Sequence, residues 1–260
     1  PIIVKANTDV YFKGGGNICN TWVNGGGIKV EGALTNVLIE NYILKGNGNY
    51  GGSPACAGVW IENGNVKIEN SLFEDNEVSS STTTGAALYV ESGNVEVVDC
   101  LFDNNKTRTS STLYGGTIFI GGGVFRIARS IVSNHTKTFG SGKSRGAGIA
   151  IYGSATVTID TCIFESNQGH TTQGMDFYNR DGTVIINDTQ FNSSTDQIGC
   201  YSGTTSISYS GSPSADSYYD TGLSFDNNFS HRASPNLSGI LPEYIGDCSS
   251  SITILSVDLA

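Results

Sequence analysis

A segment of about 29 residues recurs along the chain, and this period constrains the fold more than any other feature. Six copies share an apolar anchor, which a polar residue follows three positions later. The anchors are Leu44, Phe73, Phe102, Val132, Phe164 and Phe191, and the polar residues are Asn47, Asn76, Asn105, His135, Asn167 and Ser194. A looser copy supplies Phe225 and Asn228. A repeat of this length predicts a solenoid, in which equivalent residues stack in columns.

Each repeat contains short stretches in which apolar and polar residues alternate, as in "GVWIENGN" followed by "VKIENSLFEDN". Alternation is the period of a β-strand, and no helical period is present in the repeats. Strands of successive coils stack about 4.8 Å apart. The predicted inward columns are Val66/Val95/Phe125/Val157/Val184, Ile68/Val97/Ile127/Ile159/Ile186 and the small-residue column Ser71/Cys100/Ser130/Cys162/Thr189. The polar residues after the anchors are expected to form a fourth inward column.

The sequences that open and close the repeats resemble those of a known family. Gly85-Ala86-Ala87-Leu88, Gly115-Gly116-Thr117-Ile118 and Gly146-Ala147-Gly148-Ile149 combine with "FEDN", "FDNN" and "FESN". This pairing resembles the repeats of chlamydial polymorphic outer-membrane proteins and, more broadly, pectate-lyase-like right-handed parallel β-helices. The resemblance covers roughly residues 25 to 195 and implies secreted, adhesin-like proteins.

We therefore expect an all-β, right-handed parallel β-helix of about seven to eight coils in a single domain, residues 1–260. Residues 1–24 are predicted to form an amino-terminal coil or cap, residues 25–195 the regular coils, and residues 196–260 irregular carboxyl-terminal coils or a cap. Both chain ends read as strands, and a solenoid exposes unpaired strand edges at its ends. We expect another polypeptide to cover at least one end.

Charge and composition narrow the possible ligands. The formal net charge is −10, with only 14 Lys and Arg residues. This balance disfavours binding to nucleic acid and to anionic membrane surfaces, because both need clustered positive charge. No apolar run is long enough to span a bilayer.

The cysteines and glycosylation motifs indicate an oxidising, extracellular location. Six cysteines are present and none shows C-x-x-C spacing, so a zinc site is not expected. Cys100 and Cys162 share an inward column but lie two coils apart, which exceeds the reach of a disulfide. We predict that both are free, and that the disulfides are Cys19–Cys56 and Cys200–Cys248.

Among the sequons, Asn134, Asn187, Asn192 and Asn236 are candidate glycosylation sites, whereas Asn105 and Asn228 should point inward.

The search for catalytic groups yields only structural interpretations. His135 occupies the inward polar column, and Asp99 and Arg129 are adjacent in one outward column, where a salt bridge between coils is expected. Lys67, Glu96 and Arg126 form an outward ladder of alternating charge. Asn7-Thr8-Asp9 and Gly169-His170-Thr171 match fragments of polygalacturonase motifs, but the paired aspartates and basic tripeptide are missing. The acidic run at residues 216–226 lacks calcium-loop spacing. We predict no catalytic residue, metal or cofactor, and therefore no enzyme.

An outward aromatic column is the remaining candidate site. Trp60, Tyr89 and Phe119 occupy one outward position in three successive coils, in a column that we read as Lys29, Trp60, Tyr89, Phe119, Ala150 and Asp176. An exposed apolar strip marks a contact surface. Three interpretations compete: cover by the chain's own Ser/Thr-rich loops, an interface with another domain or subunit, or a platform for sugars. We take the strip as an interface or binding surface.

These observations favour a structural or adhesive function, in which the chain is a secreted β-helix domain of a cell-surface protein or extracellular filament. Its expected partners are other copies of the chain or neighbouring domains of a longer chain, with carbohydrate as a further candidate. The alternative is a carbohydrate-active β-helix, either a lyase- or hydrolase-like enzyme or a sugar-binding module.

Overall fold

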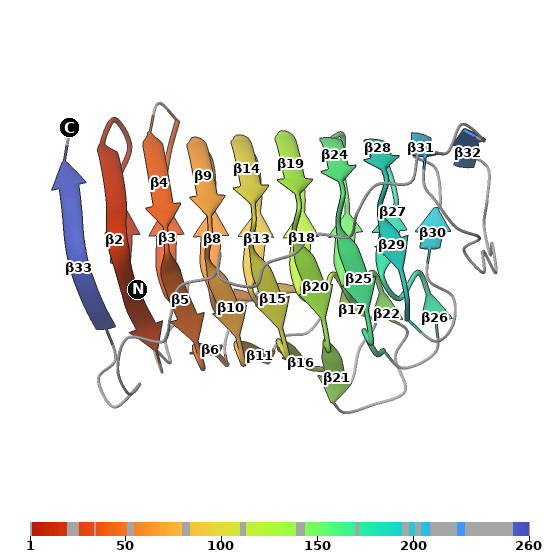
Figure 1. Cartoon of the computed structure of the whole chain (residues 1–260), viewed down its shortest axis with the longest axis horizontal. Coiled ribbons are helices and arrows are strands. Elements are labelled where there is room, and N and C mark those ends of the chain that lie inside the picture. The colour runs from red at the N-terminus through yellow and green to blue at the C-terminus, as the bar shows by residue number, and fades with distance from the viewer. Residues whose placement is uncertain are drawn as a thin grey trace.

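The computed structural model describes residues 2–19, 26–33, 35–50, 55–79, 84–109, 113–138, 144–169, 172–193, 198–200, 204–208, 223–226 and 252–259. Within these residues, every regular element is a β-strand and none is a helix. The strands are stacked along the long axis, each beside its equivalent in the next coil (Figure 1). The predicted fold class, an all-β parallel solenoid with a period near 29 residues, is confirmed.

Face A is an eight-stranded parallel sheet of three-residue strands. Its strands, in spatial order, are β1 (Ile2–Val4), β3 (Ile28–Val30), β8 (Val59–Ile61), β13 (Leu88–Val90), β18 (Ile118–Ile120), β23 (Ile149–Ile151), β27 (Phe177–Asn179) and β30 (Ile198–Cys200). Chain order and spatial order agree, which is the signature of a solenoid.

Faces B and C follow face A in each coil and are joined through one long strand. Face B contains β2 (Asp9–Cys19), β4 (Asn36–Glu40), β9 (Asn65–Glu69), β14 (Asn94–Val98), β19 (Val124–Ala128), β24 (Thr156–Asp160), β28 (Thr183–Asn187), β31 (Thr204–Ser208) and β32 (Leu223–Asp226). Face C contains β5 (Tyr42–Lys45), β10 (Leu72–Glu74), β15 (Leu101–Asp103), β20 (Ile131–Ser133), β25 (Ile163–Glu165) and β29 (Gln190–Phe191). β2 pairs with β4 through its first half and with β5 through its second.

Shorter strands continue each coil beyond face C. β6 (Gly48–Asn49), β11 (Glu77–Ser79), β16 (Lys106–Arg108) and β21 (Thr136–Thr138) form one small sheet. β7 (Ala55–Cys56) pairs with β12 (Thr84–Gly85), and β17 (Leu113–Tyr114), β22 (Ser144–Arg145) and β26 (Thr172–Gln173) form a third small sheet. These strands come from the Ser/Thr-rich segments that the repeat pattern treats as loops.

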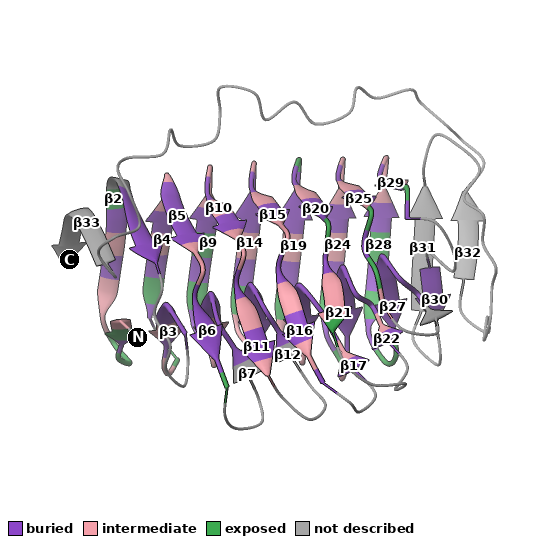
Figure 2. Ribbon diagram, turned by 90° about the horizontal axis from the view of Figure 1, so that it is seen from below, coloured by how far each residue is buried: buried purple, intermediate pink, exposed green. Residues whose placement is uncertain are grey.

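The interior is built from the predicted columns. Strand pairing places Val66, Val95, Phe125, Val157 and Val184 in one line and Ile68, Val97, Ile127, Ile159 and Ile186 in a second. All ten side chains are buried, and so are the six apolar anchors. Figure 2 shows buried residues alternating with intermediate and exposed ones along many of the described strands. Each coil therefore adds one layer of apolar side chains to a continuous core.

The corners between faces depend on residues with a positive φ. Asn41, Asn70, Asp99, Arg129, Thr161 and Asp188 occupy the corner between faces B and C with φ between 44° and 60°. Asn and Asp adopt this left-handed conformation more readily than other non-glycine residues. The small-residue column follows directly after this corner, and its hydroxyl groups accept backbone N–H groups of the preceding coil. Ser130 Oγ accepts from Cys100 N at 3.1 Å, and Thr189 Oγ1 accepts from Cys162 N at 3.2 Å.

Three register assignments from the sequence are wrong, all in coils whose length departs from the average. Asp176 does not follow Ala150 in the aromatic column, because Ala150 pairs with Tyr178. Ser193 takes the position expected for Ser194, since its hydroxyl accepts the Asn167 N–H at 2.9 Å; Ser194 itself lies outside the described residues. Phe225 pairs with Ile207 on face B and does not extend the anchor column on face C.

The last strand, β33 (Ile252–Leu259), lies at the opposite end of the solenoid from the strand that precedes it, β32 (Figure 1). It pairs antiparallel with β2, from Val10 opposite Leu259 to Ile18 opposite Ile252. The other strand pairings among the described residues are parallel. The edge of β2 is therefore covered by the chain's own carboxyl-terminal strand. Cover of another edge by a second polypeptide stays a prediction.

Candidate functional site

The outward column of face A begins as predicted and ends differently. Strand pairing aligns Lys29, Trp60, Tyr89, Phe119 and Ala150, and then continues to Tyr178. The Trp60 and Tyr89 rings meet edge to face with centroids 6.0 Å apart, and the Tyr89 and Phe119 rings stack at 4.8 Å. Edge-to-face and offset-stacked geometries are the favourable ones for aromatic pairs.

The aromatic column is covered, so the prediction of an exposed strip is wrong. Tyr89 is 7 % exposed and Phe119 is 4 % exposed, while Trp60 is half-buried. Cys56 from β7 packs with these rings, and Tyr114 from β17 and Tyr152 lie against the same cluster. The segments after face C thus fold back over face A and form a second apolar layer. Among the three interpretations of this column, cover by the chain itself is the one that the structure supports.

Cations flank the two ends of the aromatic layer. Lys29 Nζ lies 4.5 Å from the Trp60 ring centroid and pairs with Glu62 at 2.6 Å. At the other end, the guanidinium of Arg145 lies 5.1 Å from the Tyr114 ring, and that of Arg180 lies 5.0 Å from the Tyr152 ring. Cation–π contacts of this kind stabilise a partly exposed aromatic edge.

The candidate acid and base groups on the surface are engaged between coils. Arg129 donates to both carboxylate oxygens of Asp99 at 2.8 and 2.6 Å, which confirms the expected salt bridge. Arg126 donates to Glu96 at 2.9 Å, but Lys67 forms its ion pair with Glu69 on its own strand and not with Glu96. The charge ladder is therefore only partly formed.

The inward polar column is a ladder of amides. Asn47 donates to the Asn76 side chain, and Asn76 donates to the Asn105 side chain, each at 3.0 Å. Each amide also donates to a main-chain carbonyl of the preceding coil, as Asn105 does to Phe73 O at 2.9 Å. The ladder satisfies backbone groups at a bend that no strand reaches.

Two titratable residues are buried in or beside this ladder. His135 is fully buried, and burial lowers the pKa of its imidazole to about 3. The main chain of Asn105 acts in the opposite direction and raises this pKa, but its effect is smaller than that of burial. Asp176 is fully buried as well, and burial raises the pKa of its carboxyl group to about 6 against the hydrogen bonds from Ser193 and Asn167. Neither group reaches a surface at which a substrate could bind. His170 and His231 lie outside the described residues.

The cysteines follow the prediction in part. Cys100 and Cys162 are free and buried, as expected, and burial raises the pKa of both thiols to about 12. Cys56 is also free and buried, so the predicted Cys19–Cys56 disulfide is wrong. The Cys56 thiol lies 3.0 Å from Val59 O inside the aromatic layer, whereas Cys19 lies on face C and takes part in a disulfide. The predicted Cys200–Cys248 pairing lies outside the described side chains.

The candidate glycosylation sites differ in exposure. Asn134 and Asn192 are exposed, Asn187 is half-buried, and Asn236 lies outside the described residues. Asn105 is fully buried, in agreement with its predicted inward position, and Asn228 lies outside the described residues. The use of these sites by a glycosylation enzyme stays a prediction.

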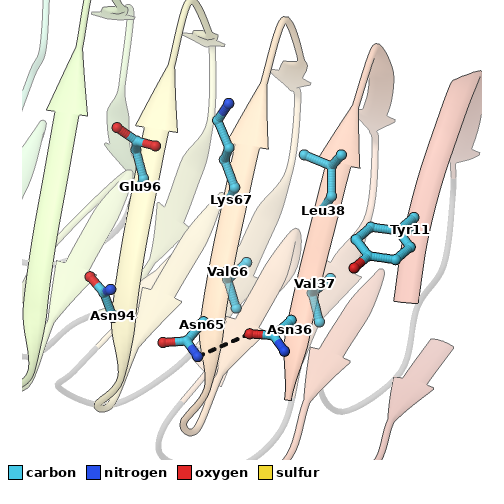
Figure 3. A pocket seen from close by; sticks show the side chains of 9 residues that line it. All are labelled: Tyr11, Asn36, Val37, Leu38, Asn65, Val66, Lys67, Asn94 and Glu96. Carbon is cyan, nitrogen blue, oxygen red and sulfur yellow. Dashed lines mark hydrogen bonds between the residues drawn. The ribbon is translucent and has the colours of Figure 1, made fainter. Parts of the chain in front are cut away.

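A hollow on the outer surface of face B is a candidate site that the sequence analysis did not indicate. It has a volume of about 360 Å³ and spans β2, β4, β9 and β14. Its lining residues are Tyr11, Asn36, Val37, Leu38, Asn65, Val66, Lys67, Asn94 and Glu96. Figure 3 shows Tyr11 pointing from β2 towards β4, with Leu38, Lys67 and Glu96 following it along one row. Several residues that line the hollow occupy outward positions of the first coils. Outward positions vary from coil to coil, so the repeat pattern of the sequence does not single them out.

No metal site or membrane-spanning helix occurs in the part of the chain that the structure describes. No group of three or more His, Cys, Asp or Glu side chains there is arranged to hold a metal ion. None of its elements is a helix long and apolar enough to cross a membrane.

Comparison with known proteins agrees with the solenoid fold over the first half of the chain. A family model described as "Right handed beta helix region" matches residues 8–128. These residues run from the start of β2 to the end of β19, and the strand register continues unbroken to β29. No curated protein and no solved structure matches the chain. The coils from β24 to β29, which lie outside the matched residues, therefore continue the same parallel solenoid.

Proposed function

We propose that the chain is a structural or adhesive β-helix domain, secreted and held at a cell surface or in an extracellular filament. The observation that carries this proposal is that the chain's acid and base groups form ion pairs between coils or are buried. Arg129 and Asp99 pair between coils, Arg126 pairs with Glu96, and His135 and Asp176 are buried in the interior. Such groups hold register and shape, which suits a rod more than a catalyst.

Carbohydrate binding is the second candidate, and the hollow on face B favours it. Hydrolysis of a glycosidic bond generally needs two carboxyl groups on opposite sides of the scissile bond. Among the described residues that line the hollow, Glu96 supplies the only carboxyl group, and it already pairs with Arg126. The hollow therefore suits a binding module better than an enzyme.

A polysaccharide panel tests the structural or adhesive function. The purified chain is incubated with neutral and acidic plant, algal and bacterial polysaccharides, and new reducing ends and unsaturated products are measured. We expect no turnover, together with retention on at least one surface polymer or self-association in light scattering. Turnover that depends on Glu96 would overturn the proposal and make the chain a carbohydrate-active enzyme.

The expected partners are further copies of the chain or neighbouring domains of a longer chain. The outer edge of β1 carries no strand among the described residues, and Ile3 on this strand is 46 % exposed. An uncovered strand edge with an apolar side chain is a surface that another polypeptide can extend. This edge, and not the aromatic column, is the place where we expect such a partner.

A further inference from the structure

The hollow on face B combines an aromatic wall with an apolar floor. Tyr11 and Leu38 are neighbours in adjacent strands, since Tyr11 pairs with Leu38 in the register of β2 and β4. Both are only partly buried, so their apolar surface faces the hollow. A flat ring beside an aliphatic side chain is the type of surface on which the C–H face of a sugar ring packs, and concave sites of this kind are the usual place for small ligands.

Amide groups with unused hydrogen-bonding capacity form the polar side of the hollow. Asp9 accepts from the Asn36 side chain at 2.7 Å, and Asn36 in turn accepts from the Asn65 side chain at 3.0 Å. This ladder stops there. Within the described residues, the side-chain oxygen of Asn65 accepts no hydrogen bond, and the amide of Asn94 makes none, although the two residues are paired in the register of β9 and β14.

The amides of Asn65 and Asn94 point to a ligand rich in hydroxyl groups. An asparagine amide offers an acceptor oxygen and two N–H donors side by side. Neighbouring hydroxyl groups of a sugar present the matching donor and acceptor at a similar spacing. Both residues are exposed and border the hollow (Figure 3), so a ligand can reach them without movement of the backbone.

The charges around the hollow favour a neutral ligand. The two charged residues that line the hollow are each engaged in an ion pair, since Lys67 pairs with Glu69 and Glu96 pairs with Arg126 at 2.9 Å. The chain as a whole carries a net charge of −10, which repels acidic polysaccharides. An anionic ligand would therefore gain little at this site.

We infer that the hollow binds one unit of a neutral pyranose glycan. The sugar ring packs on Tyr11 and Leu38, and its hydroxyl groups bind the amides of Asn65 and Asn94. The inference rests on the proposed adhesive function and gives it a ligand class and a site. It differs from the predicted sugar platform at Trp60, Tyr89 and Phe119, because that column is covered by the chain's own segments.

Titration of neutral oligosaccharides selected from a glycan array tests the site. The variants are Tyr11→Leu, which keeps apolar volume but removes the flat ring, and Asn94→Ala, which removes the unused amide. Each is expected to weaken binding about tenfold, the effect of losing one stacking or hydrogen-bonding contact. Thr183→Ala is the matched control, because Thr183 is an exposed residue of the same outward column on β28, outside the hollow. This control should bind like the parent chain, and circular dichroism checks the fold of all three.

The outcomes separate the site from the proposed function. Glycan binding that survives both Tyr11→Leu and Asn94→Ala would overturn the site and leave an adhesive function at another surface. Binding only to acidic glycans, or to none of the array, would also overturn the site. Turnover of a polysaccharide is the separate result that contradicts the structural or adhesive function.

Discussion

At the scale of single residues, the interior contains a ladder of asparagine amides, and two residues of other types are buried in or beside it. Asn47, Asn76 and Asn105 each bond to the next residue and to the backbone, which makes asparagine the natural occupant of this column. His135 stands where an asparagine would continue the ladder, and Asp176 meets its far end by accepting from Asn167 at 2.8 Å. Both exceptions are buried and titratable, so both should make stability depend on pH.

Replacement of His135 by Asn should make the protein more resistant to acid. The pKa of His135 is about 3 in the fold against an ordinary value of 6.5, so the unfolded chain binds more protons between these values. The stability that neutral His135 contributes is complete above pH 6.5 and is lost as the pH falls towards 3. By linkage, the loss between pH 7 and pH 4 is on the order of 3 kcal/mol. Urea unfolding at both pH values should show that His135→Asn removes most of this loss; an unchanged pH dependence would contradict the argument.

Replacement of Asp176 by Asn should act in the opposite direction over a similar pH range. The pKa of Asp176 is about 6 in the fold against an ordinary value of 3.8, so the folded chain holds the proton more tightly. Its contribution therefore falls as the pH rises from about 4 through 6, by about 2 kcal/mol between pH 4.5 and pH 7. The Asp176→Asn variant should lack this fall in urea unfolding. Asp181→Asn, at an exposed site, is the control that should retain it.

At the scale of elements, the strands of face A lie between two apolar layers. Leu88 and Val90 point into the main core, while Tyr89 between them packs into the second cluster with Phe119 and Cys56. The covering segments include β12, whose Gly85 leaves no room for a side chain because a Cβ there would lie 1.9 Å from Leu88 O. Glycine at this position lets the covering segment approach the backbone of face A.

Truncation of the aromatic column should therefore destabilise the fold. Phe119→Ala is expected to cost about 3–5 kcal/mol, because a buried ring is lost and the covering strands cannot collapse fully into its space. Chemical unfolding followed by circular dichroism measures the change. Val124→Ala, at an outward position that is 51 % exposed, should change stability by about 0.5 kcal/mol or less. A Phe119→Ala variant as stable as this control would mean that the column is mere surface.

At the scale of the whole molecule, the antiparallel pairing of β33 with β2 joins the two ends of the sequence. Seven residue pairs connect these strands, with one irregularity between Lys13 and Gly16. An uncovered parallel edge is a template for further strand addition. β33 thus acts as an internal cap for face B at the amino-terminal end, while the edge of β1 on face A stays open in the described structure.

Removal of residues 252–259 should convert the chain into a self-associating species. The coils themselves keep their parallel pairings and core, so circular dichroism should still report β-structure. The newly exposed edge of β2 should pair with other molecules, and light scattering should rise with protein concentration. A synthetic peptide of residues 252–259 should suppress this rise by occupying the edge. A truncated chain that stays monomeric would show that β33 does not protect the edge.

The sequence by itself determined the solenoid, its inward columns and its polar ladder. Equivalent side chains stack on one another in successive coils, so each inward position needs a similar residue type in every coil. This requirement appears in the sequence as a repeat, from Val66 to Val184 and from Asn47 to Asn167. Where a coil changes length, as before Asp176, the period fails and the register must come from strand pairing. Only the tertiary structure decided what covers face A, since the covering segments differ in length and composition between coils. It also decided that Cys56 is free and that β33 returns to β2, because contacts between distant, non-repeating segments leave no periodic trace in the chain.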